Sequence, residues 1–273
     1  MELNIVDKEN IEQFQNSGVT VLRGVFSDWI DVLRKGVAEN IANPNPDARI
    51  YEGKSVGEEK AGKFFIDFCS WQRISQYRDF IFNSAASEIA ASLMVSKEVK
   101  LFHEHVLVKE AQSGIATPWH HDMPYYCVDG PKTISIWIPL DDVPKERTLE
   151  FVAGSHLWGK SFRPQLFNGK PLNENDGLED IPDIEGNRDA FDILGWDLKP
   201  GDAVAFDYRT LHGSPANNSP TSQRRAFSLR MVGDGTRFAR RENIKTSPPF
   251  NGLTLKHGDP LEGDEFPILF SKK

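Results

Sequence analysis

Two side chains that commonly bind metals, His120 and Asp122, lie two positions apart in the sequence. On a β-strand, alternate side chains point to the same face, so these two would share one cavity while His121 points the other way. A third ligand is available in His212, far along the chain. Two imidazoles and one carboxylate that leave adjacent metal positions open are typical of non-haem Fe(II) sites. Because a His-x-Asp pair also recurs by chance, the predicted centre must agree with the rest of the chain.

The composition is that of an ordinary globular protein, with 39% hydrophobic and 26% charged residues in a chain of 273. The formal net charge of −8 argues against a nucleic-acid partner, because phosphate binding needs a basic surface. No linker rich in Ser, Gly or Pro divides the chain, so a single domain over residues 1–273 is predicted. The composition leaves the oligomeric state open.

Neither membrane insertion nor secretion is expected. No apolar run approaches the about 20 residues that span a bilayer. The first residues lack the basic and apolar regions of a signal peptide. The two cysteines, Cys69 and Cys127, are too few for a disulfide framework. A reducing, cytoplasmic location is therefore expected.

The first third of the chain is predicted to be largely helical. Apolar residues at helical spacing follow two cap signals, Asp7 and Ser27. A full capping box is not expected at the first helix, because Asn10 stands where such a box has Glu or Gln. The pattern predicts a strand over 18–26 and helices over 8–16, 27–42 and two within 74–93, the second over 84–92. Residues 48–65 stay unassigned.

The later part of the chain is predicted to be a β core. Apolar and β-branched runs bounded by turn residues predict strands over 99–109, 133–140, 149–152, within 198–206, and over 224–232. Short strands without intervening helices indicate a sandwich or closed barrel. The polar residues 159–195 show little periodicity, and they are expected to be an insertion near the barrel mouth.

An arginine in the last predicted strand suits a dicarboxylate cosubstrate. A molecule such as 2-oxoglutarate needs a guanidinium at the far end of its pocket to bind the distal carboxylate. Alternation places Arg224 with small side chains and Arg225 with large apolar ones, which favours Arg224 as the anchor. Arg225 stays an alternative, because a register slip would exchange the two faces. Ser214 follows His212 closely enough to add a hydroxyl donor.

In these motifs and their order the chain resembles the phytanoyl-CoA dioxygenase family of Fe(II)- and 2-oxoglutarate-dependent oxygenases. The resemblance runs from about residue 99 to residue 232. It is carried by Pro118-Trp119-His120-His121-Asp122, by Trp137-Ile138-Pro139-Leu140-Asp141, by Phe151-Val152-Ala153-Gly154-Ser155-His156, and by His212-Gly213-Ser214 followed by Arg224-Arg225-Ala226.

The resemblance implies a mainly β fold with flanking helices, around a double-stranded β-helix (jelly-roll, cupin-like) core. It implies Fe(II) bound by His120, Asp122 and His212, and 2-oxoglutarate bound by Arg224, Ser214 and Trp137. Dioxygen is then the second cosubstrate, and the products include succinate and carbon dioxide. The related halogenases lack the metal-binding carboxylate, so the presence of Asp122 favours hydroxylation.

A substrate pocket is expected on the strand over 99–109, where His103, His105 and Lys109 share one face that points into the cavity in family members. The alternative is a half-exposed edge strand with polar residues outward. Tyr126 is expected at the mouth of the site, although Tyr125 could take the same role. The chain has no long basic run suited to coenzyme A, which favours a small polar metabolite as substrate.

Two other functions fit the same ligands. One is a non-catalytic metal-binding jelly-roll that serves as a binding or sensor protein. The other is a zinc hydrolase, which would leave Arg224 and Ser214 without a task. Succinate formation from 2-oxoglutarate separates a dioxygenase from both.

Overall fold

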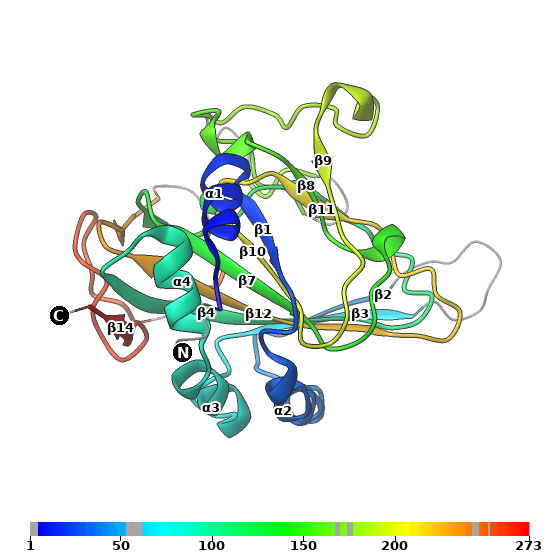
Figure 1. Cartoon of the computed structure of the whole chain (residues 1–273), viewed down its shortest axis with the longest axis horizontal. Helices are drawn as coiled ribbons and strands as arrows, with labels where there is room; N and C mark the ends of the chain where they lie inside the picture. The colour runs from blue at the N-terminus through cyan, green and yellow to red at the C-terminus, as the bar shows by residue number, and fades with distance from the viewer. Residues whose placement is uncertain are drawn as a thin grey trace.

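Antiparallel strands dominate the structure, a computed structural model that describes residues 5–52, 62–166, 170–173, 177–241, 246–250 and 252–272 (Figure 1). The strands are β1 (Val19–Leu22), β2 (Arg49–Glu52), β3 (Lys63–Phe68), β4 (Glu98–Lys109), β5 (Thr117–His120), β6 (Val128–Asp129), β7 (Thr133–Pro139), β8 (Glu150–Val152), β9 (Ile193–Leu194), β10 (Ala203–Phe206), β11 (His212–Ser214), β12 (Arg224–Gly233), β13 (Arg237–Phe238) and β14 (Ile268–Ser271). The α-helices are α1 (Lys8–Ser17), α2 (Ile30–Ala42), α3 (Ser75–Asn83) and α4 (Ala86–Met94). The 3-10 turns are η1 (Ser27–Trp29), η2 (Met123–Tyr125), η3 (Lys145–Arg147), η4 (Ser155–Leu157) and η5 (Arg188–Ala190).

Two antiparallel sheets form the core of the fold. The large sheet has the strand order β1-β10-β7-β12-β4-β3-β2, with β14 paired to β4. The small sheet has the order β5-β11-β8-β9, and β13 pairs with β6 separately. Strands distant in sequence lie side by side, as where β7 separates β10 from β12. The prediction of a mainly β, jelly-roll fold with flanking helices is confirmed.

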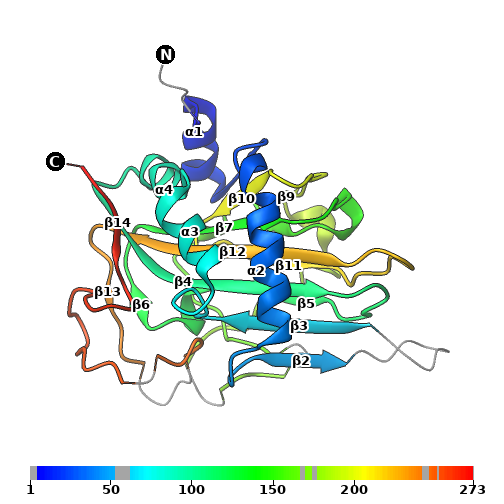
Figure 2. The same ribbon diagram turned by 90° about the horizontal axis from the view of Figure 1, so that it is seen from below.

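The two faces of the large sheet differ: one packs against helices and the other lines a cavity, as the residues of β12 show. Its apolar residues Phe227, Leu229 and Met231 belong to the main hydrophobic cluster, together with side chains from α2, α3 and α4. Figure 2 shows these helices across the outer face of the sheet. The alternate residues, Arg224 and Arg230 among them, line a cavity on the inner face. The alternation predicted for this strand is therefore present.

The first third of the chain contains two strands that were not predicted, β2 and β3, while β1 lies within the strand predicted over 18–26. All three join the large sheet. Residues 48–65, which the sequence left unassigned, supply β2 and the start of β3, and residues 53–61 lie outside the described part. Ser27 begins the turn η1 and α2 follows from Ile30, so a helix capped by the Ser27 side chain was a wrong expectation. Its hydroxyl instead donates to the Gly24 carbonyl.

The expectation that α1 lacks a full capping box is also wrong. The Asp7 carboxylate accepts the Asn10 backbone N–H at 2.8 Å, as a cap at this position should. The Asn10 side-chain oxygen then accepts the Asp7 N–H at 3.4 Å, so an amide one methylene shorter than Gln completes the reciprocal pair. Gly18 ends the helix in the left-handed region, with φ of 77°.

The described part of the polar stretch 159–195 supplies the edge strand of the small sheet and part of the cavity lining. Strand β9 pairs with β8, and η5 precedes it. Gln165, Leu166 and Leu172 line the same cavity as Arg224. This position agrees with an insertion near the mouth of the core. Among the described residues, no helix is long and apolar enough to span a membrane.

Phe227 tests how strongly the outer face of the large sheet stabilises the fold. Its ring is fully buried and lies 4.8 Å from Tyr77 and 5.5 Å from Phe80, between centroids. Phe227→Ala should lower the free energy of unfolding by about 3–5 kcal/mol, because the cavity cannot collapse fully. Phe82→Ala, at a ring that is 41% exposed, is the control and should cost much less in chemical denaturation. Equal losses would contradict this account of the core.

Candidate functional site

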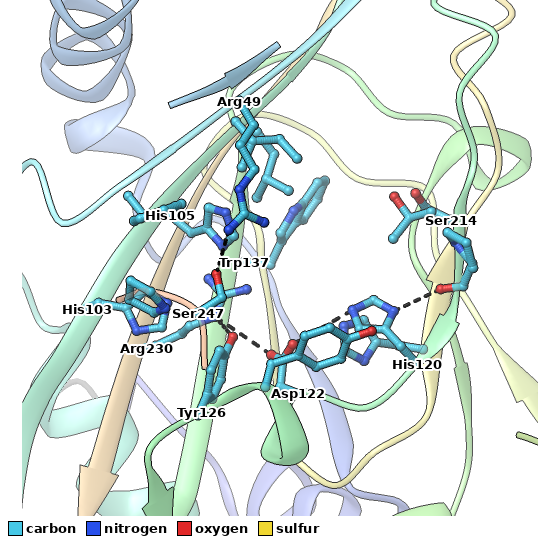
Figure 3. A pocket seen from close by; sticks show the side chains of 18 of the residues that line it. Arg49, His103, His105, His120, Asp122, Tyr126, Trp137, Ser214, Arg230 and Ser247 are labelled. Atoms are coloured by element: carbon cyan, nitrogen blue, oxygen red, sulfur yellow. Dashed lines mark hydrogen bonds and ion pairs between the residues drawn. The ribbon is translucent and has the colours of Figure 1, made fainter. Parts of the chain in front are cut away.

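Three side chains from two neighbouring segments converge in the cavity between the sheets. Antiparallel pairing of β5 and β11 places His212 directly opposite His120, with ring centroids 4.2 Å apart. Asp122 follows β5, and its Oδ1 lies 3.7 Å from His120 Nε2. One ligand atom from each of the three lies within 4.8 Å of the others. Figure 3 shows two of them, His120 and Asp122, in the cavity. All three are the residues from which the sequence predicted a metal centre.

Both imidazoles are oriented by backbone carbonyls. His120 Nδ1 lies 2.8 Å from the Pro118 oxygen, and His212 Nδ1 lies 2.9 Å from the Thr210 oxygen. A carbonyl can only accept, so each Nδ1 carries the hydrogen and each Nε2 is left with a free lone pair. Burial lowers the pKa of both imidazoles, that of His212 to about 3 with further help from His120. Neutral imidazoles of this kind fit a divalent cation.

Asp122 lies close to the two histidines, but it is not on a β-strand as predicted. Strand β5 ends at His120, and the Asp122 backbone is helical, with φ of −72° and ψ of −33°, at the start of η2. Its Oδ2 accepts a hydrogen bond from Ser135 Oγ at 3.3 Å and lies 3.7 Å from Arg230 Nε. Burial alone would raise the pKa of this carboxyl, but the positive charge of Arg230 opposes that effect, and the pKa is lowered. An ionised carboxylate therefore faces the two imidazoles.

A second cluster, about the Ser214 hydroxyl, concentrates positive charge. Arg224 Nη2 donates to Ser214 Oγ at 3.2 Å, and Lys109 Nζ donates to the same oxygen at 3.1 Å. Lys109 also donates to Thr117 Oγ1 at 3.2 Å, and Arg224 to the Arg147 carbonyl. Within the described part of the chain, no carboxylate pairs with either cation. We call these three side chains, Lys109, Ser214 and Arg224, the cationic pole.

The cationic pole fits an anionic group. Burial lowers the pKa of Arg224 to about 10, with Arg147 adding to the shift, and burial with Arg224 lowers the pKa of Lys109. Two buried cations that share one neutral hydroxyl are costly without a counter-ion. A bound carboxylate would supply it, and the planar guanidinium is suited to bidentate contact.

Neighbouring candidates point elsewhere. Arg225 pairs with Asp141, with Nη2 to Oδ1 at 2.6 Å, rather than lining the cavity. His121 faces away, as expected, and its Nε2 accepts the Phe162 N–H at 2.9 Å. His156 lies in the turn η4, as the sequence indicated.

The cavity itself encloses about 680 Å³ between the two sheets. His103 and His105 line it from β4, Trp137 from β7, and Tyr126 from the segment after η2 (Figure 3). Tyr125 lines it as well, so both tyrosines that the sequence suggested belong to the cavity lining. Lys109, on β4, lies near Arg224, since both contact Ser214 Oγ. Farther along the same strand pair, Arg230 of β12 lies opposite His103 of β4.

The sequence did not identify three further residues of this lining, Arg49, Arg230 and Ser247. Arg230 shares the strand parity of Arg224, which was a usable signal. Arg49 fell in the unassigned segment, and Ser247 lies after the last predicted strand. The side chains of Arg49 and Ser247 interact at the cavity mouth, where Arg49 Nη2 donates to Ser247 Oγ at 3.3 Å.

A family model described as "Phytanoyl-CoA dioxygenase (PhyH)" matches residues 14–226 of this chain. No curated protein matches it. Among solved structures, the carbocyclase SnoK from nogalamycin biosynthesis, a non-haem α-ketoglutarate-dependent enzyme, superposes with a TM-score of 0.77 at 23% identity, covering 97% of this chain and 96% of SnoK.

Two further structures share the fold. The epimerase SnoN, in complex with Fe³⁺, α-ketoglutarate and nogalamycin RO, has a TM-score of 0.73 at 20% identity, covering 96% of this chain and 98% of SnoN. EctD from S. alaskensis, with 2-oxoglutarate and 5-hydroxyectoine, has a TM-score of 0.69 at 18% identity, covering 96% of this chain and 87% of EctD.

The buried histidines should make the stability of the metal-free protein depend on pH. Burial, with His120 nearby, lowers the pKa of His121 to about 4, below the about 6.5 of an unfolded histidine. The unfolded chain then binds more protons in this window, so the free energy of unfolding should fall as pH falls from about 6.5 towards 4. Denaturant unfolding across this window measures the slope.

His121→Gln should make that pH dependence shallower, because the amide keeps an acceptor for the Phe162 N–H without titrating. His257→Gln, at an exposed histidine, is the matched control. A wild-type stability that is flat across the window would contradict the assigned burial.

Proposed function

Because the chain belongs to the phytanoyl-CoA dioxygenase family, we propose that it is an Fe(II)- and 2-oxoglutarate-dependent dioxygenase that hydroxylates a small polar metabolite and releases succinate and carbon dioxide. The observation that carries the proposal is the pairing of two features in one cavity. Three ligand atoms lie within 4.8 Å of one another, and two buried cations lie nearby without a carboxylate partner in the described residues.

In this proposal His120, Asp122 and His212 hold Fe(II). The two Nε2 atoms and one carboxylate oxygen match the two-histidine, one-carboxylate set that leaves adjacent positions open. When bound, the iron and its cosubstrates supply the redox chemistry, while the protein supplies position and exclusion of water. Ser135 and Arg230 hold Asp122 Oδ2, so Oδ1 is the oxygen presented towards His120.

The cationic pole of Lys109, Ser214 and Arg224 binds the distal carboxylate of 2-oxoglutarate. Arg224 offers the planar guanidinium, and Lys109 a second charge that the sequence had assigned to the substrate pocket. The ring of Trp137 is 4% exposed, lies in the cavity lining and forms a wall for the cosubstrate. Cosubstrate binding thereby offsets the unfavourable burial of two like charges.

Turnover without an added metabolite tests the proposal directly. Purified protein supplied with Fe(II), ascorbate and dioxygen should slowly convert 2-oxoglutarate to succinate. Asp122→Ala should abolish both this turnover and Fe(II) binding measured by anaerobic calorimetry, because it removes the charged ligand. Asp28→Ala, at an exposed carboxylate, is the control. Tight Fe(II) binding by the wild type, without any turnover, would instead indicate a non-catalytic metal-binding jelly-roll.

Arg224→Gln should raise the KM for 2-oxoglutarate by about 10- to 100-fold, which corresponds to losing one hydrogen-bonded charge. Succinate release at increasing 2-oxoglutarate concentration measures it. Arg225→Gln is the matched control, because that guanidinium pairs with Asp141 outside the cavity lining. A larger effect from Arg225→Gln would reverse the assignment of the anchor.

A further inference from the structure

A second polar surface in the cavity contacts the proposed iron site, among the described residues, only through Arg230, which lies 3.7 Å from Asp122, and it is separate from the cationic pole. It lies on the large sheet, where β12 pairs with β4 in a register that sets Ser228 opposite His105 and Arg230 opposite His103. All four side chains occupy the inner-face parity of their strands. We call His103, His105, Ser228 and Arg230 the polar floor. Figure 3 shows both histidines and Arg230 together, apart from Ser214.

The polar floor has hydrogen-bonding atoms without partners in the described structure. They are both ring nitrogens of His103 and of His105, the Ser228 hydroxyl and Arg230 Nη1, all of them buried. Native proteins pair nearly all such atoms, because each one left unpaired costs about 1–3 kcal/mol. His103, His105 and Arg230 line the cavity, and Ser228 lies opposite His105 on the same face of the sheet. Unpaired polar atoms gathered at one wall indicate a surface suited to a polar ligand. The imidazoles and the hydroxyl can donate or accept, and Arg230 Nη1 can only donate.

Arg49 adds a cation at the mouth, beside this floor. Its guanidinium carbon lies 5.6 Å from the Phe68 ring centroid, and its side chain reaches across to Ser247. In the described part of the chain no carboxylate pairs with it. Figure 3 shows Arg49 pointing inward near His105. Its charge is therefore available to a molecule that occupies the cavity.

The charge balance of the cavity favours an anion. Three arginines, Arg49, Arg224 and Arg230, line it, whereas Asp122 is the only carboxylate among the described lining residues. Fe(II) and the dianion of 2-oxoglutarate would cancel each other and leave this excess positive charge in place. Apolar side chains such as Ile66, Phe68 and Leu107 form the adjoining wall. A cationic substrate would meet repulsion at both ends of such a site.

We propose that the substrate carries an oxyanion, a carboxylate or a phosphate, which Arg49 and the polar floor bind while its carbon skeleton lies along the apolar wall. This rests on the proposed function, because it takes the cationic pole to be filled by 2-oxoglutarate. Charge-assisted contacts from a guanidinium fix the anion, and the imidazoles of His103 and His105 complete its hydrogen bonds.

Four matched probes test this: 3-phenylpropanoate, 3-phenylpropyl phosphate, 3-phenylpropan-1-ol and 3-phenylpropylamine. Their dissociation constants are measured by anaerobic calorimetry on protein loaded with Fe(II) and saturating 2-oxoglutarate, which blocks the cationic pole. At least one anion should bind about tenfold or more tightly than the alcohol, and the amine most weakly. The two anionic probes separate carboxylate from phosphate recognition. Equal binding of anion and alcohol would overturn the proposal.

Arg49→Gln should remove the preference for the anion and leave the affinity for the alcohol unchanged, and Arg49→Lys should restore part of the preference. Arg78→Gln, at an exposed arginine on α3, is the control. If Arg49→Gln weakens all four probes equally, Arg49 only closes the mouth through Ser247, and the proposal is wrong.

If the proposed dioxygenase function is wrong, the result differs from a failure of the oxyanion proposal. A protein that takes up neither Fe(II) nor 2-oxoglutarate shows this in calorimetry before any probe is added. The same series measured on the unloaded protein would then decide the anion preference of Arg49 and the polar floor on its own.

Discussion

Backbone pairing between β5 and β11 is the constraint on which the site depends. It sets His212 opposite His120 and fixes how far apart the two rings lie. The carbonyls of Pro118 and Thr210 then aim both rings from within the same two segments. Asp122 joins them because the chain turns immediately after β5. The small sheet and the turn that follows β5 thus carry the entire candidate metal set on ordered backbone, as precise ligand geometry requires.

The large sheet forms the opposite wall of the cavity, and its other face packs in the hydrophobic core. Along β12 the core residue Phe227 alternates with Arg224 and Ser228, so one strand holds the helices on one side and the cavity on the other. A shift of one residue would bury the arginines among apolar helices and expose the core side chains to the cavity. Packing of the core therefore also fixes the positions of the charged side chains that face inward.

Local patterns predicted much of this arrangement. Strand alternation placed Arg224 rather than Arg225 in the cavity, and the residue types of His120, Asp122 and His212 indicated a metal centre before any fold was known. The geometry assumed for Asp122 was wrong, because a strand end cannot be located to one residue from propensity.

Other residues of the cavity could not be predicted from the sequence, because their positions depend on pairing between strands that are far apart in the chain. Arg49 lies on an edge strand whose sequence has no clear period, and it reaches the cavity only because β2 pairs with β3 and β3 with β4. Ser247 meets it from nearly two hundred residues away in sequence. No local signal records such a contact, since it depends on the whole order of the large sheet.

The single oxygen that Lys109 and Arg224 share has one more consequence. A serine hydroxyl has two lone pairs and one hydrogen, and the two cations occupy both lone pairs of Ser214. Its O–H bond is thereby turned away from them and can serve only as a donor. The uncharged Ser214 is in this way polarised by its neighbours and offers a hydrogen, not a lone pair, to a bound molecule. The three N–H groups of Lys109 already go to Thr117, Ser214 and Pro215, so Lys109 contributes its charge alone.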